Sequence, residues 1–326
     1  MARQRTAAQS VTSFADRFEA IVENVEQIIS GKEDAIRLAL VCLAAEGHLL
    51  IEDVPGVGKT SLAKALAASI DGVYNRIQFT PDLLPSDVTG VMVYNRTSGG
   101  FEFRHGGIFA NIVLADEINR ASPKTQSALL EAMEERQVTI DTTTYHLDTP
   151  FMVIATQNPI EHEGTYPLPE SQLDRFLMRV EMGYPDKASE IEILDTHSGA
   201  PRIDEVKPVA TASDVETMVR LAQAVHVAPS LKTYLVDLSD ATRRHPRATL
   251  GVSPRGTLAL LRASRALAAS VGREFVLPDD VKALAGPVLE HRLLLTPEAQ
   301  MGGVTQADVL DEILASVAVP TARSER

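Results

Sequence analysis

Apolar residues near the start of the chain recur with the period of an α-helix. Phe14, Phe18, Ile21 and Val25 lie three or four positions apart, and a second stretch with this period runs on to about residue 46. The spacing predicts two helices ahead of the first strand.

Past residue 48 the pattern changes to short apolar runs that alternate with helical stretches. Such runs are typical of buried strands, and their alternation with helices is typical of a parallel sheet covered by helices. We therefore predict an α/β core, a parallel sheet with helices on both faces, that ends near Tyr184-Pro185. The five runs are HLLIED, VYNRIQF, NIVLAD, FMVIAT and FLMRVEM.

Two stretches interrupt this alternation. Residues 91–105 (VMVYNRTSGGFEFRH) and 136–150 (RQVTIDTTTYHLDTP) each have the pattern of strand, polar turn and strand, which predicts two inserted β-hairpins. Hairpins of this kind are either surface decoration or functional inserts, and the pattern alone leaves both interpretations open.

Strand-like runs nearly vanish in the last third of the chain, which predicts a small all-helical domain. We expect residues 1–197 to form the α/β core with its N-terminal helices and hairpins, 198–210 to form a linker, and 211–326 to form a helical lid with a tail. The predicted lid helices are at about 212–226, 230–245, 254–271 and 278–290.

Composition narrows the functional classes. A net charge of −13 argues against non-specific binding to nucleic acid or to an anionic membrane surface. The longest apolar run, Leu38 to Ala45, is too short to span a membrane, and no apolar segment follows the two arginines of the first ten residues. The single Cys42 lies in an apolar run and is predicted to be a buried hydrophobe. We expect a cytoplasmic protein without membrane insertion.

A candidate phosphate-binding loop lies between the first predicted strand and a helix, in LLIEDVPGVGKTSLAKAL (49–66). Gly56 and Gly58 allow backbone conformations that other residues resist, Lys59 reaches phosphate oxygens, and the Thr60 hydroxyl is a Mg²⁺ ligand. Asp53 stands where the usual pattern has its first glycine. Because it lies at the strand end, it need not face phosphate. The predicted nucleotide-binding residues are Asp53, Val54, Pro55, Gly56, Val57, Gly58, Lys59, Thr60 and Ser61.

Two adjacent acids end the run NIVLAD. Asp116 and Glu117 fall at the carboxyl end of a buried strand, where open α/β sheets bind ligands. We predict that Asp116 holds the Mg²⁺ water shell and that Glu117 accepts a proton from the attacking water. They are not simple helix-start acids, because the next helix is predicted to begin later, with Ser122 as its N-cap.

Three further residues are candidates for the reaction. Asn158 follows a buried strand and could hold the lytic water. Taken alone, it is better explained as part of a turn-forming Asn-Pro pair, but the phosphate loop and the two acids favour the functional interpretation. Asp174 and Arg175 are predicted at exposed positions of a short helix, as either a surface ion pair or an arginine finger for a neighbouring subunit. Arg255 lies in the first turn of a helix whose N-cap is Ser253. A positive charge there opposes the helix dipole, and such local conflicts are typical of functional sites.

Taken together, these motifs resemble the MoxR family of AAA+ ATPases over about residues 14–300. The resemblance is carried by GHLLIEDVPGVGKTSLAKALA, FEFRHGGIFANIVLADEINRASPKTQSALLEAMEERQVTI, ATQNPIEHEGTYPLPESQLDRF and, in the lid, GVSPRGTLALLRASRALAA. The family shares the aspartate of the phosphate loop. Lys32 departs from the Gly-Gln that the family usually has near this position.

The resemblance implies a P-loop NTPase that uses ATP with Mg²⁺. It implies that Asn158 is sensor 1, Arg175 the arginine finger and Arg255 sensor 2, acting within its own subunit or on a neighbour. The hairpins correspond to the helix-2 and pre-sensor-1 inserts. The resemblance further implies homo-oligomeric rings, commonly hexamers. It also implies chaperone-like action on protein partners, often with a von Willebrand factor A (VWA) domain, including metal-cofactor insertion.

The alternative function is a nucleic-acid-associated AAA+ motor. The acidic balance argues against it, and the 136–150 hairpin carries only Arg136 and His146 as cations. We therefore expect no nucleic-acid partner.

Overall fold

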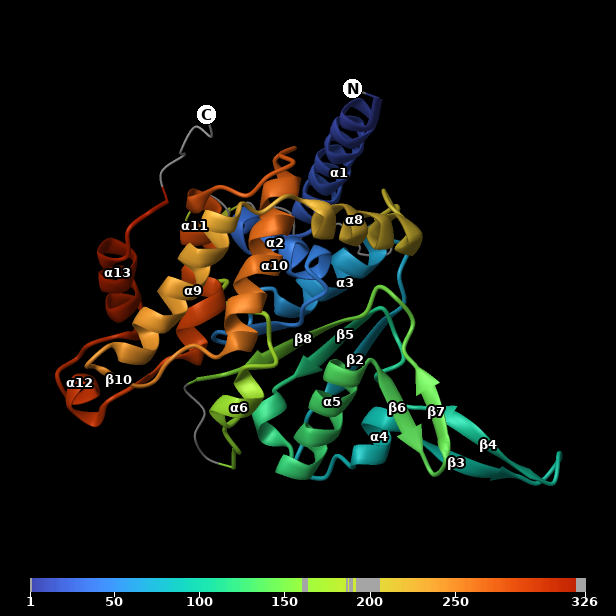
Figure 1. The fold of residues 1–326 in the computed structure, drawn as a ribbon. Helices are drawn as coiled ribbons and strands as arrows, with labels where there is room; N and C mark the ends of the chain where they lie inside the picture. Colours follow the sequence, from blue (N-terminus) through green and yellow to red (C-terminus); the bar gives the residue numbers. More distant parts are fainter. Residues whose placement is uncertain (1, 160–163, 186, 188–189, 192–205, 321–326) are drawn as a thin grey trace.

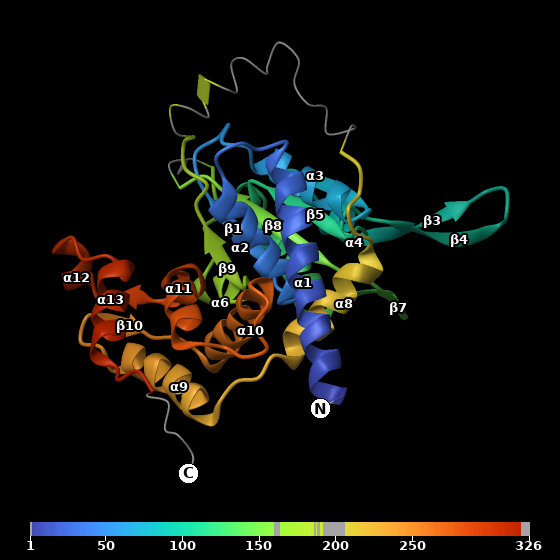
Figure 2. The same ribbon diagram turned by 90° about the horizontal axis from the view of Figure 1, so that it is seen from above.

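The computed structural model describes residues 2–159, 164–185, 187, 190–191 and 206–320. Its centre is a five-stranded sheet with the strand order β2-β5-β8-β1-β9, in which all neighbours are parallel. All five predicted strands are confirmed (Figures 1 and 2). They are β1 Leu49–Glu52, β2 Tyr74–Gln78, β5 Ile112–Asp116, β8 Met152–Gln157 and β9 Met178–Val180.

Helices cover both faces of this sheet, as predicted. Successive strand residues point to opposite faces, so Ile112 and Leu114 of β5 pack with the N-terminal helices, whereas Val113 and Ala115 pack with α5. Ser122 caps α5 by accepting a hydrogen bond from the Thr125 N–H, which confirms the predicted helix start. The core helices are α1 Ala2–Glu26, α2 Glu33–Ala44, α3 Lys59–Ser69, α4 Pro85–Thr89, η1 Ile118–Arg120, α5 Pro123–Glu135 and α6 Glu170–Leu173.

Both predicted hairpins are present. They consist of β3 Gly90–Asn95 with β4 Gly100–His105, and β6 Gln137–Ile140 with β7 Thr143–His146. The β3–β4 hairpin projects from the body of the molecule (Figure 1). Phe103 at its base stacks on Tyr145 of the other hairpin, with ring centroids 4.0 Å apart. Further out, Tyr94 and Phe101 are exposed and form an edge-to-face pair.

The C-terminal part is mostly helical, and the four predicted helices are confirmed. Our expectation of an all-helical lid is wrong in one detail, because β10 Ala248–Leu250 and β11 Leu294–Leu295 form an antiparallel pair. Strands of two and three residues are too short to show a period, so no pattern of apolar residues predicted them. The helices are α8 Ala212–Ala224, α9 Pro229–Arg244, α10 Pro254–Ser270, α11 Pro278–Leu289, η3 Glu290–Arg292, α12 Pro297–Met301 and α13 Gln306–Ser316.

The lid helices and the N-terminal helices share one hydrophobic core. The helix α1 lies beside α2, α3, α8 and α10 (Figure 2), and residues as far apart as Phe14, Leu40 and Leu260 belong to one buried cluster. The proposed division at 197 and 211 stays a prediction, because residues 198–205 of the expected linker lie outside the described residues. Among the helices that the structure describes, none is both long and apolar enough to cross a membrane.

Candidate nucleotide site

The phosphate loop connects β1 to α3. Gly56 has φ +87° and Gly58 has φ +96°, in the left-handed region that favours glycine. Gly58 is the N-cap of α3, so the free backbone N–H groups and the positive end of the helix dipole lie at this turn. The loop therefore has the geometry that binds a phosphate group.

The aspartate in the loop makes contacts within the protein. The Asp53 carboxylate accepts hydrogen bonds from the N–H of Val54 at 2.7 Å and from the N–H of Gly183 at 2.5 Å. It thereby ties the start of the loop to the chain that follows β9. This geometry agrees with the expectation that the aspartate need not face phosphate.

Two lysines support the loop in different ways. The Lys59 ammonium donates to the carbonyl oxygen of Asp53 at 2.5 Å. Burial lowers the pKa of Lys59, and the carboxylates of Asp53, Asp116 and Glu117 offset part of this effect. Lys32 is buried and donates to the carbonyls of Met182, Gly183 and Tyr184 at 2.7–2.9 Å. This departure from the family pattern therefore holds the chain after β9.

The two acids of β5 lie where predicted, at the carboxyl end of the strand. Asp116 accepts hydrogen bonds from Arg76 at 2.6 Å and from the Thr156 hydroxyl at 2.6 Å. The Glu117 carboxylate accepts one from the Gln78 side chain at 2.8 Å, and Glu117 has φ +56°. Backbone strain at a non-glycine residue is typical of functional sites.

Arg76, Gln78 and Thr156 were missed by the sequence analysis. They lie on β2 and β8, the two neighbours of β5, and Gln78 is paired in register with Asp116. The order of strands in a parallel sheet cannot be read along the chain, so no pattern marked these side chains as partners of the acids. The position of Gln78 and Thr156 near strand ends was the only available signal, and Arg76 in the middle of β2 had none.

A cavity of about 440 Å³ opens above these residues. Gln157, beside Asn158, has an Nε2 atom that is buried and has no hydrogen-bond partner, so it is available to a ligand. Of the predicted nucleotide-binding residues 53–61, Asp53, Val54 and Val57 do not line this cavity, and Val57 is buried in the core. The lining consists of Pro55, Gly56, Gly58, Lys59, Thr60, Ser61, Arg76, Asp116, Glu117, Thr156, Gln157 and Asn158.

The oxygen ligands at this cavity suit a magnesium ion that is also bound by phosphate oxygens. Thr60 and Asp116 both line the cavity and offer a hydroxyl and a carboxylate oxygen. Within the described part of the chain, no group of three or more His, Cys, Asp and Glu side chains forms a metal cage. Mg²⁺ in nucleotide sites is normally held by one or two protein oxygens together with waters and phosphates, so the residues fit that ion.

The two candidate arginines lie together, at a different cavity. Arg175 and Arg255 both form ion pairs with Glu134 near the end of α5, the first with Nε 3.3 Å from the carboxylate. They line a cavity of about 270 Å³ that shares no lining residue with the phosphate cavity. The structure therefore brings the two arginines together and keeps them out of the phosphate cavity of their own chain.

Asp174 connects the segment that carries Arg175 to the lid. Its carboxylate accepts one hydrogen bond from Arg292 at 2.7 Å and another from the Ser253 hydroxyl at 3.0 Å. Ser253 is the N-cap of α10, the helix that carries Arg255. The predicted exposure of Asp174 and Arg175 is wrong, because the lid covers them and leaves 21% and 30% of the two side chains accessible.

Comparisons with known proteins agree with this architecture. Residues 48–178 match the model of the ATPase family associated with various cellular activities (AAA), and residues 240–313 match the AAA lid domain. A solved structure from Cytophaga hutchinsonii, which its name assigns to the ATPases, has a TM-score of 0.92 and is 39% identical to this chain. It covers 98% of this chain, and this chain covers all of it. The fold and the phosphate loop therefore define an AAA ATPase.

Relatives along the whole chain identify the family. The uncharacterized protein YeaC of Bacillus subtilis is 52% identical over 93% of this chain and 95% of its own length. Chaperone MoxR1 of Mycobacterium tuberculosis is 39% identical over 96% and 85%, and protein MoxR of Paracoccus denitrificans is 31% identical over 96% and 99%. The chain belongs to the MoxR family of AAA+ ATPases.

Proposed function

We propose that the protein binds Mg-ATP in the phosphate cavity and hydrolyses it at the seams between subunits of a homo-oligomeric ring. The observation that carries this proposal is the separation of two half-sites. The phosphate loop and the two acids line one cavity, whereas Arg175 and Arg255 line another. A triphosphate gains cationic stabilisation from the arginines only if a second chain supplies them.

Each residue of the phosphate cavity has a role in this proposal. Lys59 and the loop N–H groups hold the β- and γ-phosphates, and Thr60 and Asp116 hold Mg²⁺, which neutralises charge on the phosphate oxygens. A water oxygen attacks the γ-phosphorus while the bond to the β–γ bridging oxygen breaks. Glu117 accepts the proton of that water, and the products are ADP and phosphate.

Side chains around Glu117 position the reaction. Hydrogen bonds from Gln78 at 2.8 Å and from Arg120 at 3.1 Å hold the carboxylate of Glu117. Asn158 and the unpartnered amide of Gln157 line the same cavity and orient the attacking water or the γ-phosphate.

The two arginines act on the neighbouring subunit. Arg175 is the arginine finger, and Arg255 acts with it in trans, since both side chains are held by the same carboxylate of Glu134. In the assembled ring the γ-phosphate of the neighbour replaces Glu134 as their anionic partner. A cation that stabilises the transition state accelerates phosphoryl transfer by about 10³- to 10⁵-fold in related NTPases.

We infer that the ATPase acts on client proteins. The exposed pair Tyr94 and Phe101 on the projecting β3–β4 hairpin offers an apolar contact, and two of the relatives above are named chaperone MoxR1 and protein MoxR. We infer a cytoplasmic ring, a hexamer in the commonest form, that remodels partners such as VWA-domain proteins. Metal-cofactor insertion is one such task. In the other hairpin Arg136 is paired with Glu46, which disfavours nucleic acid as the partner.

The test is Glu117→Gln. The amide keeps the shape and loses the basicity, so ATP binding stays within about threefold while turnover falls by about 10²- to 10⁴-fold. Binding is measured by titration calorimetry with Mg-ATP and turnover by phosphate release. The matched control is Glu131→Gln on the outer face of α5, which leaves both unchanged. Turnover near the wild-type rate in Glu117→Gln would exclude Glu117 as the base.

A further inference from the structure

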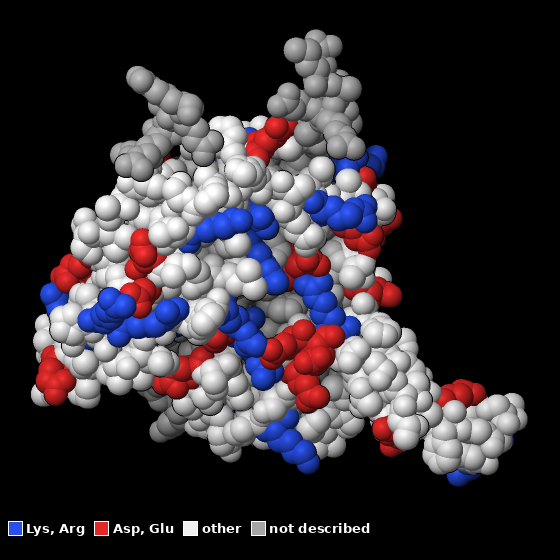
Figure 3. Space-filling view, viewed as in Figure 1, with Lys and Arg blue, Asp and Glu red and all other residues white. Residues whose placement is uncertain are grey.

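A groove crosses the face of the molecule that carries the two arginines. Three adjoining cavities of about 310, 270 and 320 Å³ are all lined by Glu46, at the corner between α2 and β1. They extend from α8 at one end to Arg175 and Arg255 at the other. Lys and Arg side chains gather around the hollowed centre of this face (Figure 3).

One wall of the groove is a stripe along α10. Leu258, Arg262 and Arg265 follow Arg255 by three, seven and ten residues, so the four side chains share one face of the helix. Leu258 is 45% exposed between two arginines. In the described part of the chain Arg262 has no hydrogen-bond or ion-pair partner, and the Nε atom of Arg265 is buried without one.

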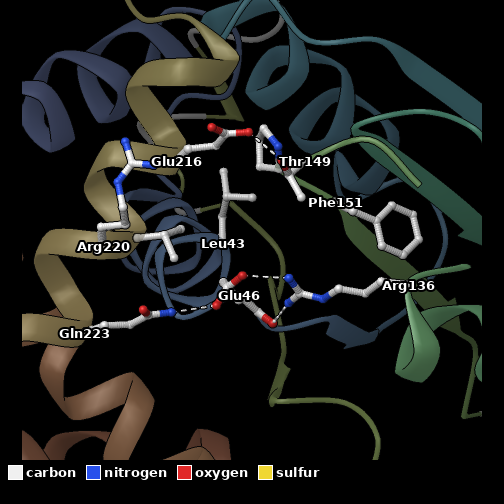
Figure 4. Close-up of a pocket in the computed structure, with 10 residues that line it drawn as sticks. Leu43, Glu46, Arg136, Thr149, Phe151, Glu216, Arg220 and Gln223 are labelled. Atoms are coloured by element: carbon white, nitrogen blue, oxygen red, sulfur yellow. Dashed lines mark hydrogen bonds and ion pairs between the residues drawn. The ribbon is translucent and has the colours of Figure 1, made fainter. Parts of the chain in front are cut away.

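Among the arginines of α10 in the described part of the chain, Arg255 alone is paired with an acid of the groove, Glu134. The Glu46 carboxylate already accepts hydrogen bonds from Arg136 and Gln223, and Glu216 accepts one from the Thr149 hydroxyl (Figure 4). Within the described residues, the hydroxyl of Thr217 is the only hydrogen-bond acceptor of Arg220 on α8. The groove therefore carries surplus positive charge beside an exposed leucine, and arginine beside apolar surface is typical of protein interfaces.

The same chain has a surface of opposite charge next to its phosphate loop. Glu19, Glu23, Glu26 and Glu33 cluster where α1 ends and α2 begins, and Arg37 is paired with only two of them. Burial, and after it the repulsion from Glu33, raises the pKa of Glu26, as expected where negative charge is in excess. Ile29, just after α1, lies against Gly58 of the phosphate loop.

We propose that the groove of one subunit docks the acidic surface formed by Glu19, Glu23, Glu26 and Glu33 of a second copy of this chain. The inference rests on the proposed function, because that function places Arg255 of one subunit at the phosphate loop of the next. From the phosphate loop outward, the groove of one subunit and the acidic surface of the next extend over similar lengths. Arg262 lies two helical turns, about 10 Å, beyond Arg255, and Glu19 lies two turns beyond Glu26.

Charge reversal tests this pairing. Arg262→Glu and Glu23→Arg each place like charges across the seam, so each raises the protein concentration needed for half-maximal assembly by about tenfold, and the double variant restores it. Assembly is measured by sedimentation velocity with Mg²⁺ and a slowly hydrolysed ATP analogue. The matched control is Arg244→Glu on α9, whose side chain is 79% exposed, and it assembles like the wild type. Circular dichroism checks the fold of each variant.

The outcomes separate this inference from the proposed function. If the wild type hydrolyses ATP only when assembled, yet both single reversals assemble normally, the docking inference fails and the function stands. A double variant that stays as weak as its parents also overturns the pairing. If Arg262→Glu assembles normally but loses binding to a single-stranded DNA oligonucleotide, nucleic acid occupies the groove and the inference is wrong. If wild-type turnover per chain is independent of assembly, the proposed function itself fails.

Discussion

The contact between Asp174 and the lid provides a quantitative prediction for Asp174→Ala. Arg292, its partner, has only 3% of its side chain exposed, so removal of the carboxylate leaves a buried cation without its counter-charge. Loss of one partner of a buried ion pair costs about 3–5 kcal/mol. We expect the lower end, about 3 kcal/mol, because Arg292 also donates to the carbonyls of Phe176 and Leu177.

The same substitution also affects the reaction. Asp174 precedes Arg175 and accepts a hydrogen bond from Ser253, which caps the helix that carries Arg255. Its removal lets both arginines shift, and shifts of about 1 Å cost up to about a hundredfold in rate. We expect kcat to fall by roughly ten- to a hundredfold while KM for ATP changes little, because the phosphate cavity is untouched.

The assays are thermal unfolding and steady-state phosphate release. A loss of about 3 kcal/mol lowers the unfolding midpoint by about 4 °C in a protein of this size. The matched control is Asp240→Ala, which removes an exposed ion pair with Arg244 and costs less than about 1 kcal/mol. Asp174→Asn keeps a hydrogen-bond acceptor for Arg292, so its loss of stability lies between those of Asp174→Ala and Asp240→Ala. Equal stability and kcat for Asp174→Ala and Asp240→Ala would refute the reasoning.

Two further predictions follow from buried contacts. Gln78→Ala leaves the Glu117 carboxylate with its contact to Arg120 but without the shorter hydrogen bond from Gln78. We expect kcat to fall at least tenfold without weaker ATP binding, as measured by phosphate release and calorimetry, and an unchanged kcat would contradict the positioning role. Burial lowers the pKa of His48 from 6.5 to about 4, so between these pH values the unfolded chain binds a proton that the folded chain does not. The free energy of unfolding therefore falls by about 3 kcal/mol for this residue as the pH drops from about 6.5 to about 4. Above pH 6.5 this residue has no effect on stability. Urea unfolding across pH measures it, and a slope no smaller in His48→Gln would contradict the assignment.

Much of the fold was predictable because each element has its own local signal. Four of the five sheet strands are mainly apolar, and α5 and α10 begin at the expected caps, Ser122 and Ser253. The pair β10 and β11 had no such signal, because strands this short show no period. The helices α12 and α13 also went unpredicted.

The candidate site was also predictable only in part. The phosphate loop, Asp116 and Glu117 were predictable because each is a local motif at a strand end, and the roles assigned to them stay predictions. The partners of those residues were not predictable. Gln78 contacts Glu117 only because β2 neighbours β5, and Arg292 reaches Asp174 across 118 positions of sequence. Contacts of this kind depend on how the elements pack, which no local pattern specifies.

The central claim is that ATP is hydrolysed between two copies of the chain, and a mixing experiment tests it most directly. Lys59→Ala removes the phosphate grip and Arg175→Ala removes the finger, so each variant alone is inactive. In a randomly mixed ring about one seam in four combines an intact loop with an intact finger, so the equimolar mixture should recover about a quarter of wild-type turnover. A mixture that stays inactive, although sedimentation shows that the two variants co-assemble, would contradict the account.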